Sequence, residues 1–520
     1  MTSPVPEPPT SGWRRTIWNV LTNWASFLIS VGTSLLLSPY IVHTLGDVTY
    51  GAWVLLGSLV GYLGLLDLGA RGAVTKYIAT YHAAHRHEEA GLIASTALAL
   101  FGAMGVVAIA ASGVLALLVN HAFQVPPELA EVTRIALVIS GVTLAVSLVS
   151  GVFGGIVVGM QRFDSLNVVN IVLTLSQAVS VALVLYAGGG LVGIALVQLV
   201  VSVIRAIASA WLSRRLYPQL ALRARSWSRP HLRTIFSFGL SAAAIHAAGA
   251  IINYTDALVI GAFLPVAMIT SFAIAAMIMD QVRTVIAGIS QTLSPMVGAL
   301  EGRRRAGDVG EVLLQGARFA TLAVLPIVVT LEIRGSSFIG VWMGPAYAAP
   351  VGAVLMVLTA AIWPFAGFQV VTATMIGINR HRSLIPIFVG EAVLNLLLSI
   401  VLIQRFGIVG VAWGTALPRV IVSLIAGPLF VSHNLGVSLG AYYTRTLLRP
   451  IVGVIPFVLV TLAIERWWPA VNIVEFFGQV LVALPVALVG AWFGVLTSSE
   501  RQAVAAALGI RRLTLTGQVG

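Results

Sequence analysis

The chain has 520 residues, of which 58% are hydrophobic and only 9% are charged, and it carries a net charge of +12. A water-soluble protein has roughly 25% charged residues, so this composition excludes a soluble fold and makes the lipid bilayer the solvent. The apolar stretches run for about 20 residues or more, which predicts spanning helices and excludes the shorter alternating strands of a barrel. There is no cysteine, which excludes disulfides and thiolate metal sites.

In chain order, the sequence begins with a polar stretch, residues 1–16, that is rich in Pro and Ser and lacks the apolar core of a signal peptide. We expect it to be a disordered cytoplasmic tail. Apolar segments follow and predict an all-α integral membrane protein with about fourteen transmembrane helices. These segments are 17–42, 50–78, 91–118, 130–158, 164–187, 190–212, 232–262, 265–299, 311–333, 350–376, 383–404, 407–432, 446–465 and 471–497.

Basic residues cluster in alternate loops of this series of helices. The opposite loops hold only Arg334, Arg405 and Arg466. Basic loops face the cytoplasm, so the pattern predicts that both termini are cytoplasmic and that the number of spans is even. The basic segments are 14–15, 76–86, 162, 214–233, 303–305, 380–382, 445–449 and 501–512.

Two short blocks recur in register and indicate an internal repeat. Residues 159–166 resemble residues 377–384, and residues 191–195 resemble residues 408–412. The two blocks lie at equivalent points of two span pairs, which predicts a parallel repeat with both halves starting from the cytoplasm. The predicted parts are an N-terminal six-helix bundle (17–213), a basic cytoplasmic linker (214–233), a C-terminal six-helix bundle (234–432), two added helices (446–497) and a cytoplasmic tail (498–520).

Polar side chains follow helical spacing on the first and seventh spans. Such a stripe is expected to face water or protein, because lipid would not solvate it. The first span carries Asn19, Asn23, Ser26, Ser30 and Thr33, and the seventh carries His246, Asn253 and Asp256.

Acid–base pairs occupy the second and eighth spans. Asp67 and Arg71 are spaced i, i+4, whereas Asp280 and Arg283 are spaced i, i+3 and precede Gln291. Each pair is either self-satisfied or part of a binding site. Polar faces on spans 1, 2, 7 and 8 favour a hydrophilic cavity between the two halves. Glu391 is either a proton-coupling carboxylate or an acid hydrogen-bonded near Asn395.

Signals for soluble-enzyme chemistry are missing from the sequence. No Walker loop is present, so we expect no ATP drive, no cofactor and no enzymatic activity. His82, His85 and His87 are interpreted as a solvated cytoplasmic loop rather than a metal site. Arg205 and Arg318, near the predicted cytoplasmic ends of their spans, are expected to extend toward the interface.

Several segments resemble a known family. Residues 45–51 (LGDVTYG), 65–69 (LLDLG) and 76–79 (KYIA) resemble the opening of polysaccharide-biosynthesis flippases of the Wzx type. Residues 253–256 (NYTD) and 258–261 (LVIG) resemble the seventh helix of the same family, which lies within the multidrug/oligosaccharidyl-lipid/polysaccharide exporter superfamily.

The resemblance implies transport of undecaprenyl-diphosphate-linked oligosaccharide across the bacterial inner membrane, by alternating access and at the expense of an H⁺ or Na⁺ gradient. It implies Arg71 and Arg283 as pyrophosphate ligands, because the guanidinium fork donates bidentate hydrogen bonds. Asn23, Ser30, Asn253 and Gln291 are further cavity candidates. Asp67, Asp256, Asp280 and Glu391 are candidates for ion coupling or structural charge. Membrane lipids, a polysaccharide polymerase and glycosyltransferases are the implied partners; nucleic acid and metals are not.

Three alternatives remain open at this point. A drug/cation antiporter of the same superfamily is the first, although the first span lacks the acid that is common in that branch. A membrane glycosyltransferase or polymerase is the second, and the short outer loops disfavour it. A scaffold or scramblase-like helper is the third; retained activity after neutralisation of the cavity charges would indicate it.

Overall fold

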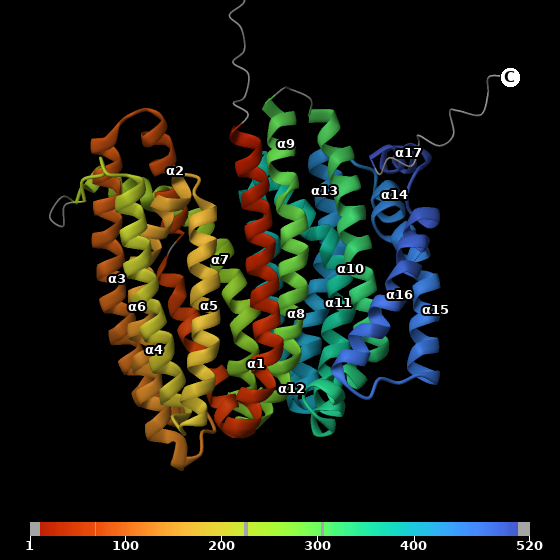
Figure 1. The fold of residues 1–520 in the computed structure, drawn as a ribbon, viewed down its shortest axis with the longest axis horizontal. Coiled ribbons are helices and arrows are strands. Elements are labelled where there is room, and N and C mark those ends of the chain that lie inside the picture. The colour runs from red at the N-terminus through yellow and green to blue at the C-terminus, as the bar shows by residue number, and fades with distance from the viewer. Residues whose placement is uncertain (1–10, 68, 223–226, 303–305, 508–520) are drawn as a thin grey trace, which may run out of the picture. The chain divides into compact units, whose positions relative to one another are not determined.

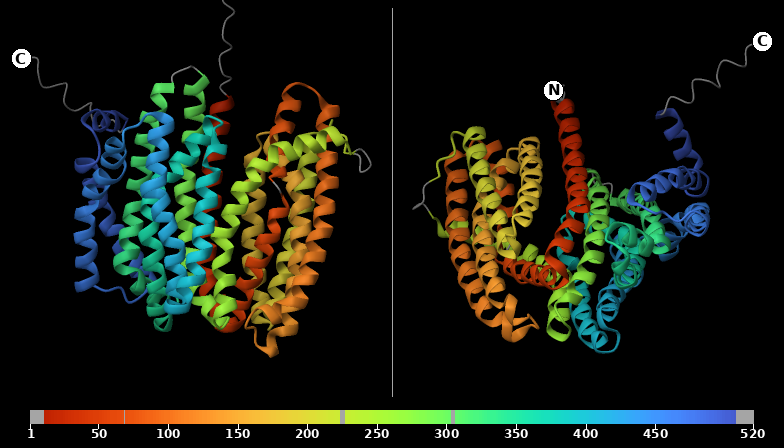
Figure 2. Two further views of the ribbon diagram at one scale, coloured as in Figure 1. Left: turned by 180° about the vertical axis from the view of Figure 1, so that it is seen from behind. Right: turned by 60° about the horizontal axis from the view of Figure 1, so that its bottom comes forward.

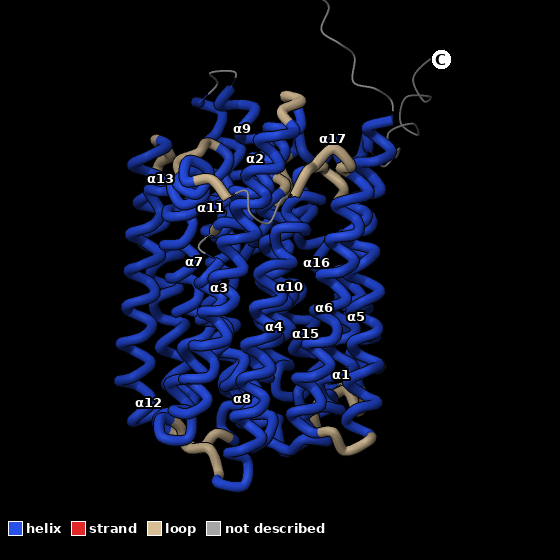
Figure 3. The backbone as a smooth tube through the Cα atoms, turned by 90° about the vertical axis from the view of Figure 1, so that its left-hand side faces the viewer, coloured by secondary structure: helices blue, strands red, loops and turns tan. Residues whose placement is uncertain are grey.

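The computed structural model describes residues 11–67, 69–222, 227–302 and 306–507, and the chain divides into two compact units, residues 1–273 and 274–520. Within these described ranges all regular structure is helical, and the loops lie at the ends of the helices (Figure 3). The prediction of an all-α membrane protein is confirmed. A transmembrane helix satisfies its own backbone hydrogen bonds, which is why an apolar chain in lipid adopts this structure.

The first unit contains seven helices, one 3-10 turn and the start of an eighth helix. They are α1 (Ser11–Leu63), η1 (Gly64–Asp67), α2 (Ala70–Ala83), α3 (His87–Ala122), α4 (Pro127–Gly159), α5 (Phe163–Tyr186), α6 (Gly190–Leu216), α7 (Arg229–Phe263) and α8 (Ala267–Gln291).

Helices α3, α4 and α6 lie side by side in this unit (Figure 1). Small residues permit the close approach of α3 to α4, because a Cβ at Gly141 would overlap the hydroxyl of Ser112. Lipid supplies no hydrophobic drive between helices, so such close van der Waals packing is what holds them together. A buried cluster around Val74, Ile93 and Val152 joins α2 to α3 and α4.

The second unit contains the remainder of α8 and the C-terminal helices. They are α9 (Leu293–Gly302), α10 (Ala306–Trp342), α11 (Pro345–Gly377), η2 (His381–Leu384), α12 (Ile385–Ile421), the π-helical η3 (Val422–Ala426), α13 (Gly427–Leu435), α14 (Leu439–Tyr442), the π-helical η4 (Tyr443–Leu448), α15 (Arg449–Trp467), α16 (Ile473–Gly494) and α17 (Ser498–Ala507).

Helices α15 and α16 pack against each other and against α10 (Figure 2). A Cβ on Gly490 would overlap the carbonyl oxygen of Gly453, so these two glycines set the closeness of α15 and α16. Arg334 of α10 is 1% exposed and bonds Glu465 of α15 and Gln479 of α16. The prediction that Arg334 lies in an outer loop is therefore wrong: hydropathy ended the span early, at a charge that is buried.

Twelve helices in the described ranges are long and apolar enough to cross a membrane. Two of them are kinked at glycines with positive φ, Gly46 (φ 74°) in α1 and Gly407 (φ 58°) in α12. Each kink separates two of the predicted spans, at a conformation that glycine adopts without steric cost. All fourteen predicted segments thus have helical counterparts, while the number that cross the bilayer stays a prediction.

The predicted domain boundaries also stay predictions. Helix α1 already begins at Ser11, inside the predicted tail 1–16, and α17 occupies part of the predicted tail 498–520. The predicted linker 214–233 includes the end of α6 and the start of α7. Residues 1–10, 223–226 and 508–520 of these parts lie outside the described residues.

Candidate functional site

The second predicted span is interrupted in its middle. Helix α1 ends at Leu63, the 3-10 turn follows, and Gly69 takes a left-handed conformation (φ 69°) before α2 begins at Ala70. Irregular backbone at membrane depth is tolerated only where protein buries it or where it lines a water-filled cavity. Hydropathy alone does not detect this break, because the interrupting residues are glycine and leucine apart from Asp67.

Asp67 and Arg71 meet at the break. The Asp67 carboxylate accepts a hydrogen bond from the Arg71 backbone N–H at 3.2 Å, and it lies 3.4 Å from the Arg71 Nε. Half of the Arg71 side chain is exposed, as is 28% of Asp67, so the pair is open rather than sealed. The predicted i, i+4 pairing is thus present in the structure.

The Arg71 guanidinium rests on α4 at Gly151. A Cβ on this glycine would lie 2.6 Å from the Arg71 Nε, closer than real contacts allow. Gly151 therefore provides the space in which the guanidinium lies against α4.

A cavity of about 330 Å³ lies between the break and α7, within the first unit. Its polar lining comes from Asp67, His246, Asn253 and Tyr254. Beside it, the hydroxyls of Tyr62 and Thr255 share a hydrogen bond that joins α1 to α7. Gly61 lets the Tyr254 ring pack directly on α1, since a Cβ there would lie 2.6 Å from the ring.

The other candidates of this unit lie outside the cavity lining. Arg71 adjoins the cavity only through Asp67, and Asp256 is buried on α7. Ser30 is exposed on α1, and the side chain of Asn23 lies outside the described residues. The structure therefore brings together Asp67, Arg71 and Asn253, and does not bring Ser30 or Asp256 to them.

In the second unit, Arg283 pairs with Asp280 at 3.3 Å, as the i, i+3 spacing predicts. The Arg283 side chain is 24% exposed, whereas Asp280 is 64% exposed. Arg283 lines a small cavity of about 10 Å³ together with Arg419. That volume is about one water molecule, so the second-unit site is closed around the guanidinium in this structure. Gln291 is exposed at the end of α8.

Glu391 is buried and pairs with Arg419 rather than with Asn395. Its carboxylate lies 3.1 Å from the Arg419 Nε, and the two side chains are 2% and 8% exposed. Asn395 instead donates to Thr415 at 2.9 Å. Arg419 also lies over the Phe365 ring, 4.6 Å from its centre. No local pattern indicates this pair, because the partners are 28 residues apart.

One further long-range pair and one buried acid have no counterpart in the sequence pattern. Arg318 is buried against Glu500 of α17, 182 residues further along the chain, and the expectation that it extends toward the interface stays a prediction. Glu332 of α10 has a buried carboxylate oxygen for which the described residues provide no hydrogen-bond donor. Within that part of the chain, no group of three or more His, Asp or Glu side chains could hold a metal ion; His87 instead bonds the Tyr217 hydroxyl at 2.7 Å.

Comparison with known proteins gives a family match and a fold. A family model described as "Polysaccharide biosynthesis protein" matches residues 13–301. The chain is 22% identical to the uncharacterized membrane protein EpsK of Bacillus subtilis (strain 168). The alignment extends over 450 residues and covers 84% of this chain and 86% of EpsK.

Solved structures at lower identity share the fold. The lipid II flippase MurJ, in an inward closed conformation, superposes with a TM-score of 0.72 at 11% identity, over 95% of this chain and 99% of MurJ. An inward-facing multidrug resistance transporter of the MATE family, within the MOP superfamily, gives 0.65 at 16% identity, over 78% of this chain and 98% of that one. The chain therefore shares the fold of these two proteins.

Proposed function

The chain belongs to the polysaccharide biosynthesis protein family, and we propose that it is a flippase that moves undecaprenyl-diphosphate-linked oligosaccharide from the inner to the outer leaflet of a bacterial cytoplasmic membrane. Transport would proceed by alternating access, coupled to H⁺ or Na⁺, with both termini in the cytoplasm. A polysaccharide polymerase and glycosyltransferases would be its partners in the pathway.

The interrupted span beside a polar cavity is the observation that carries this proposal. The break in the backbone, the half-exposed Arg71 guanidinium and a cavity of about 330 Å³ lie next to one another in the first unit. Transporters commonly bind substrate at discontinuous helices near the middle of the membrane.

The chemistry of Arg71 suits a diphosphate. Its guanidinium can donate two parallel hydrogen bonds to phosphate oxygens, and Gly151 leaves space for it against α4. At present Asp67 occupies the Nε side. An incoming phosphate would compete with this carboxylate, and a displaced Asp67 would be available to take up a proton or Na⁺. Arg283, with the more exposed Asp280 as its partner, would act in the same way after its site opens.

One observation favours the drug/cation antiporter as a second candidate. Asp67 lines the cavity directly, whereas Arg71 does not, and an acidic lining attracts cations. Efflux of a cationic dye by cells expressing the protein, abolished by Asp67→Asn, would support this alternative against the flippase.

Complementation tests the flippase directly. In a strain that lacks its lipid-linked oligosaccharide flippase, Arg71→Ala and Arg283→Ala should abolish surface glycan while immunoblotting shows normal amounts in the membrane. Arg405→Ala is the matched control, because Arg405 is an exposed arginine at a predicted outer turn. Normal glycan export by both arginine variants would overturn the assignment of Arg71 and Arg283.

A further inference from the structure

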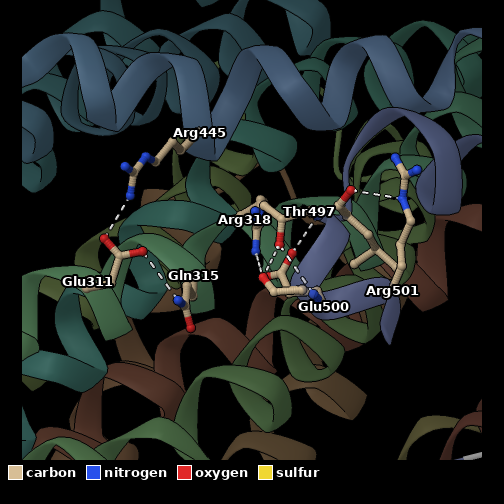
Figure 4. A network of polar contacts seen from close by, with 9 residues as sticks. Glu311, Gln315, Arg318, Arg445, Thr497, Glu500 and Arg501 are labelled. Carbon is tan, nitrogen blue, oxygen red and sulfur yellow. Dashed lines mark hydrogen bonds and ion pairs between the residues drawn. The ribbon is translucent and has the colours of Figure 1, made fainter. Parts of the chain in front are cut away.

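A second polar cavity, of about 410 Å³, lies in the second unit at the end that carries α17. Its walls come from α10, η4, α15 and α17, and Figure 4 shows the polar side chains that gather there. The basic members are Arg318, Arg445 and Arg449, and hydroxyls come from Thr497 and Ser499. The loop charges predict that this end faces the cytoplasm.

Two of the three cations are already neutralised. Arg445 pairs with Glu311 at 2.7 Å, and the same glutamate accepts from Gln315 at 3.3 Å. Arg318 pairs with Glu500. The Glu500 carboxylate also caps α17 by accepting from the Thr497 backbone N–H at 2.8 Å, so the pair fixes this helix against α10 (Figure 4).

The donors that remain point to an anion. The Arg318 side chain is 5% exposed, and its Nε–H is buried with no hydrogen-bond partner among the described residues. An unsatisfied buried donor costs about 1–3 kcal/mol, so a bound acceptor would be stabilising. Arg449 is exposed, and the described part of the chain gives it neither an ion pair nor a hydrogen bond. Three arginines and two glutamates leave the cavity with one net positive charge.

An apolar stripe starts beside Arg449 and continues along α15. Leu448, Val452, Ile455 and Leu459 are 53%, 57%, 48% and 62% exposed, and their spacing of four, three and four places them on one helix face. In a membrane this face contacts acyl chains. An amphiphile with a singly charged anionic head and apolar chains therefore matches both the charge of the cavity and the surface next to it.

We propose that this cavity binds the phosphate group of an anionic phospholipid of the inner leaflet. The phosphodiester carries one negative charge, accepts hydrogen bonds from the Arg318 Nε–H and the Arg449 guanidinium, and leaves its acyl chains on the α15 stripe. This site is separate from the cavity beside Asp67, and the proposal does not depend on which substrate the protein transports.

The test uses the purified full chain in detergent and a fluorescent phosphatidylglycerol, with fluorescent phosphatidylcholine as the zwitterionic control. Arg449→Gln should weaken phosphatidylglycerol binding roughly tenfold, the loss expected for a charge-assisted hydrogen bond. Arg382→Gln removes an equally exposed arginine, in η2 of the same unit, and should change binding less than about twofold.

A second variant separates binding from folding. Arg318→Lys keeps a cation for Glu500 but removes the Nε–H, so it should weaken lipid binding without changing the protease resistance of α17. Equal binding by Arg449→Gln and Arg382→Gln, or equal affinity for the two lipids, would overturn the proposal. Displacement of the lipid by millimolar inorganic phosphate would overturn the lipid assignment and identify a site for free phosphate.

Discussion

The buried pair of Glu391 and Arg419 gives a prediction that separates a structural acid from a proton-coupling acid. Both side chains are more than nine-tenths buried and are 3.1 Å apart. Removal of one partner of such a pair costs about 3–5 kcal/mol, because the other charge stays buried and uncompensated. In Glu391→Ala, Arg419 keeps its cation–π contact with the Phe365 ring, and this contact offsets roughly 1 kcal/mol of the lost stability. We therefore expect a loss of about 3 kcal/mol, with most of it recovered in the double variant Glu391→Ala/Arg419→Met.

The free energy of unfolding of the purified protein in detergent, measured by chemical denaturation, checks this value. Glu89→Ala, which removes an exposed ion pair with Arg86, serves as the control and should leave stability unchanged. A loss below about 1 kcal/mol in Glu391→Ala, or no recovery in the double variant, would refute the reasoning. Abolished glycan export by a fully stable Glu391→Gln would instead assign the acid to proton coupling.

Three further predictions follow from single contacts. Gly151→Ala should weaken complementation at normal membrane abundance, because its Cβ, 2.6 Å from the present Arg71 Nε, would displace the guanidinium, whereas Gly154→Ala, with no heavy atom within 4 Å, should complement fully. Gly490→Ala should lower stability by about 1–3 kcal/mol in denaturant unfolding by forcing α15 and α16 apart, and Gly478→Ala, which meets open space, should not. Burial raises the pKa of Glu500, but hydrogen bonds from Thr497 and the charge of Arg318 outweigh it and hold the pKa below its ordinary value of 4.5. Docking of α17 should thus be fully stabilised above pH 4.5 and lost as the pH falls through the lower folded-state pKa, seen as faster hydrogen exchange in residues 498–507; unchanged exchange would exclude this linkage.

Local patterns in the sequence were sufficient for the helices and for the short-range pairs. Apolar runs fixed the fourteen segments because the bilayer sets the length of a span, and both kinks, at Gly46 and Gly407, fall at predicted junctions between spans. The pair of Asp280 with Arg283 is present because both residues lie on α8, where helical spacing brings their side chains together. Asp67 and Arg71 also pair, but they do so across the break, where their short separation along the chain and not a continuous helix brings them together.

The remaining features depend on packing between distant segments. Arg334 and Glu465 are 131 residues apart and Arg318 and Glu500 are 182 residues apart, so no periodicity indicates either pair. The break at Gly64 to Gly69 is equally invisible to hydropathy, because two glycines change the backbone without lowering the apolar character of the span. Residues 65–69 (LLDLG) contain the one sequence feature that indicates the break, because the acid Asp67 lies inside an otherwise apolar segment.

Transport by the purified chain tests the central claim most directly. The protein would be reconstituted in liposomes that contain undecaprenyl-diphosphate-linked oligosaccharide in the inner leaflet, and arrival of glycan at the outer leaflet would be followed with an added lectin under an imposed ion gradient. The flippase account predicts transfer well above that of empty liposomes, and its loss in Arg71→Ala. Transfer no faster than in empty liposomes, or an equal rate in Arg71→Ala and the wild-type protein, would contradict it.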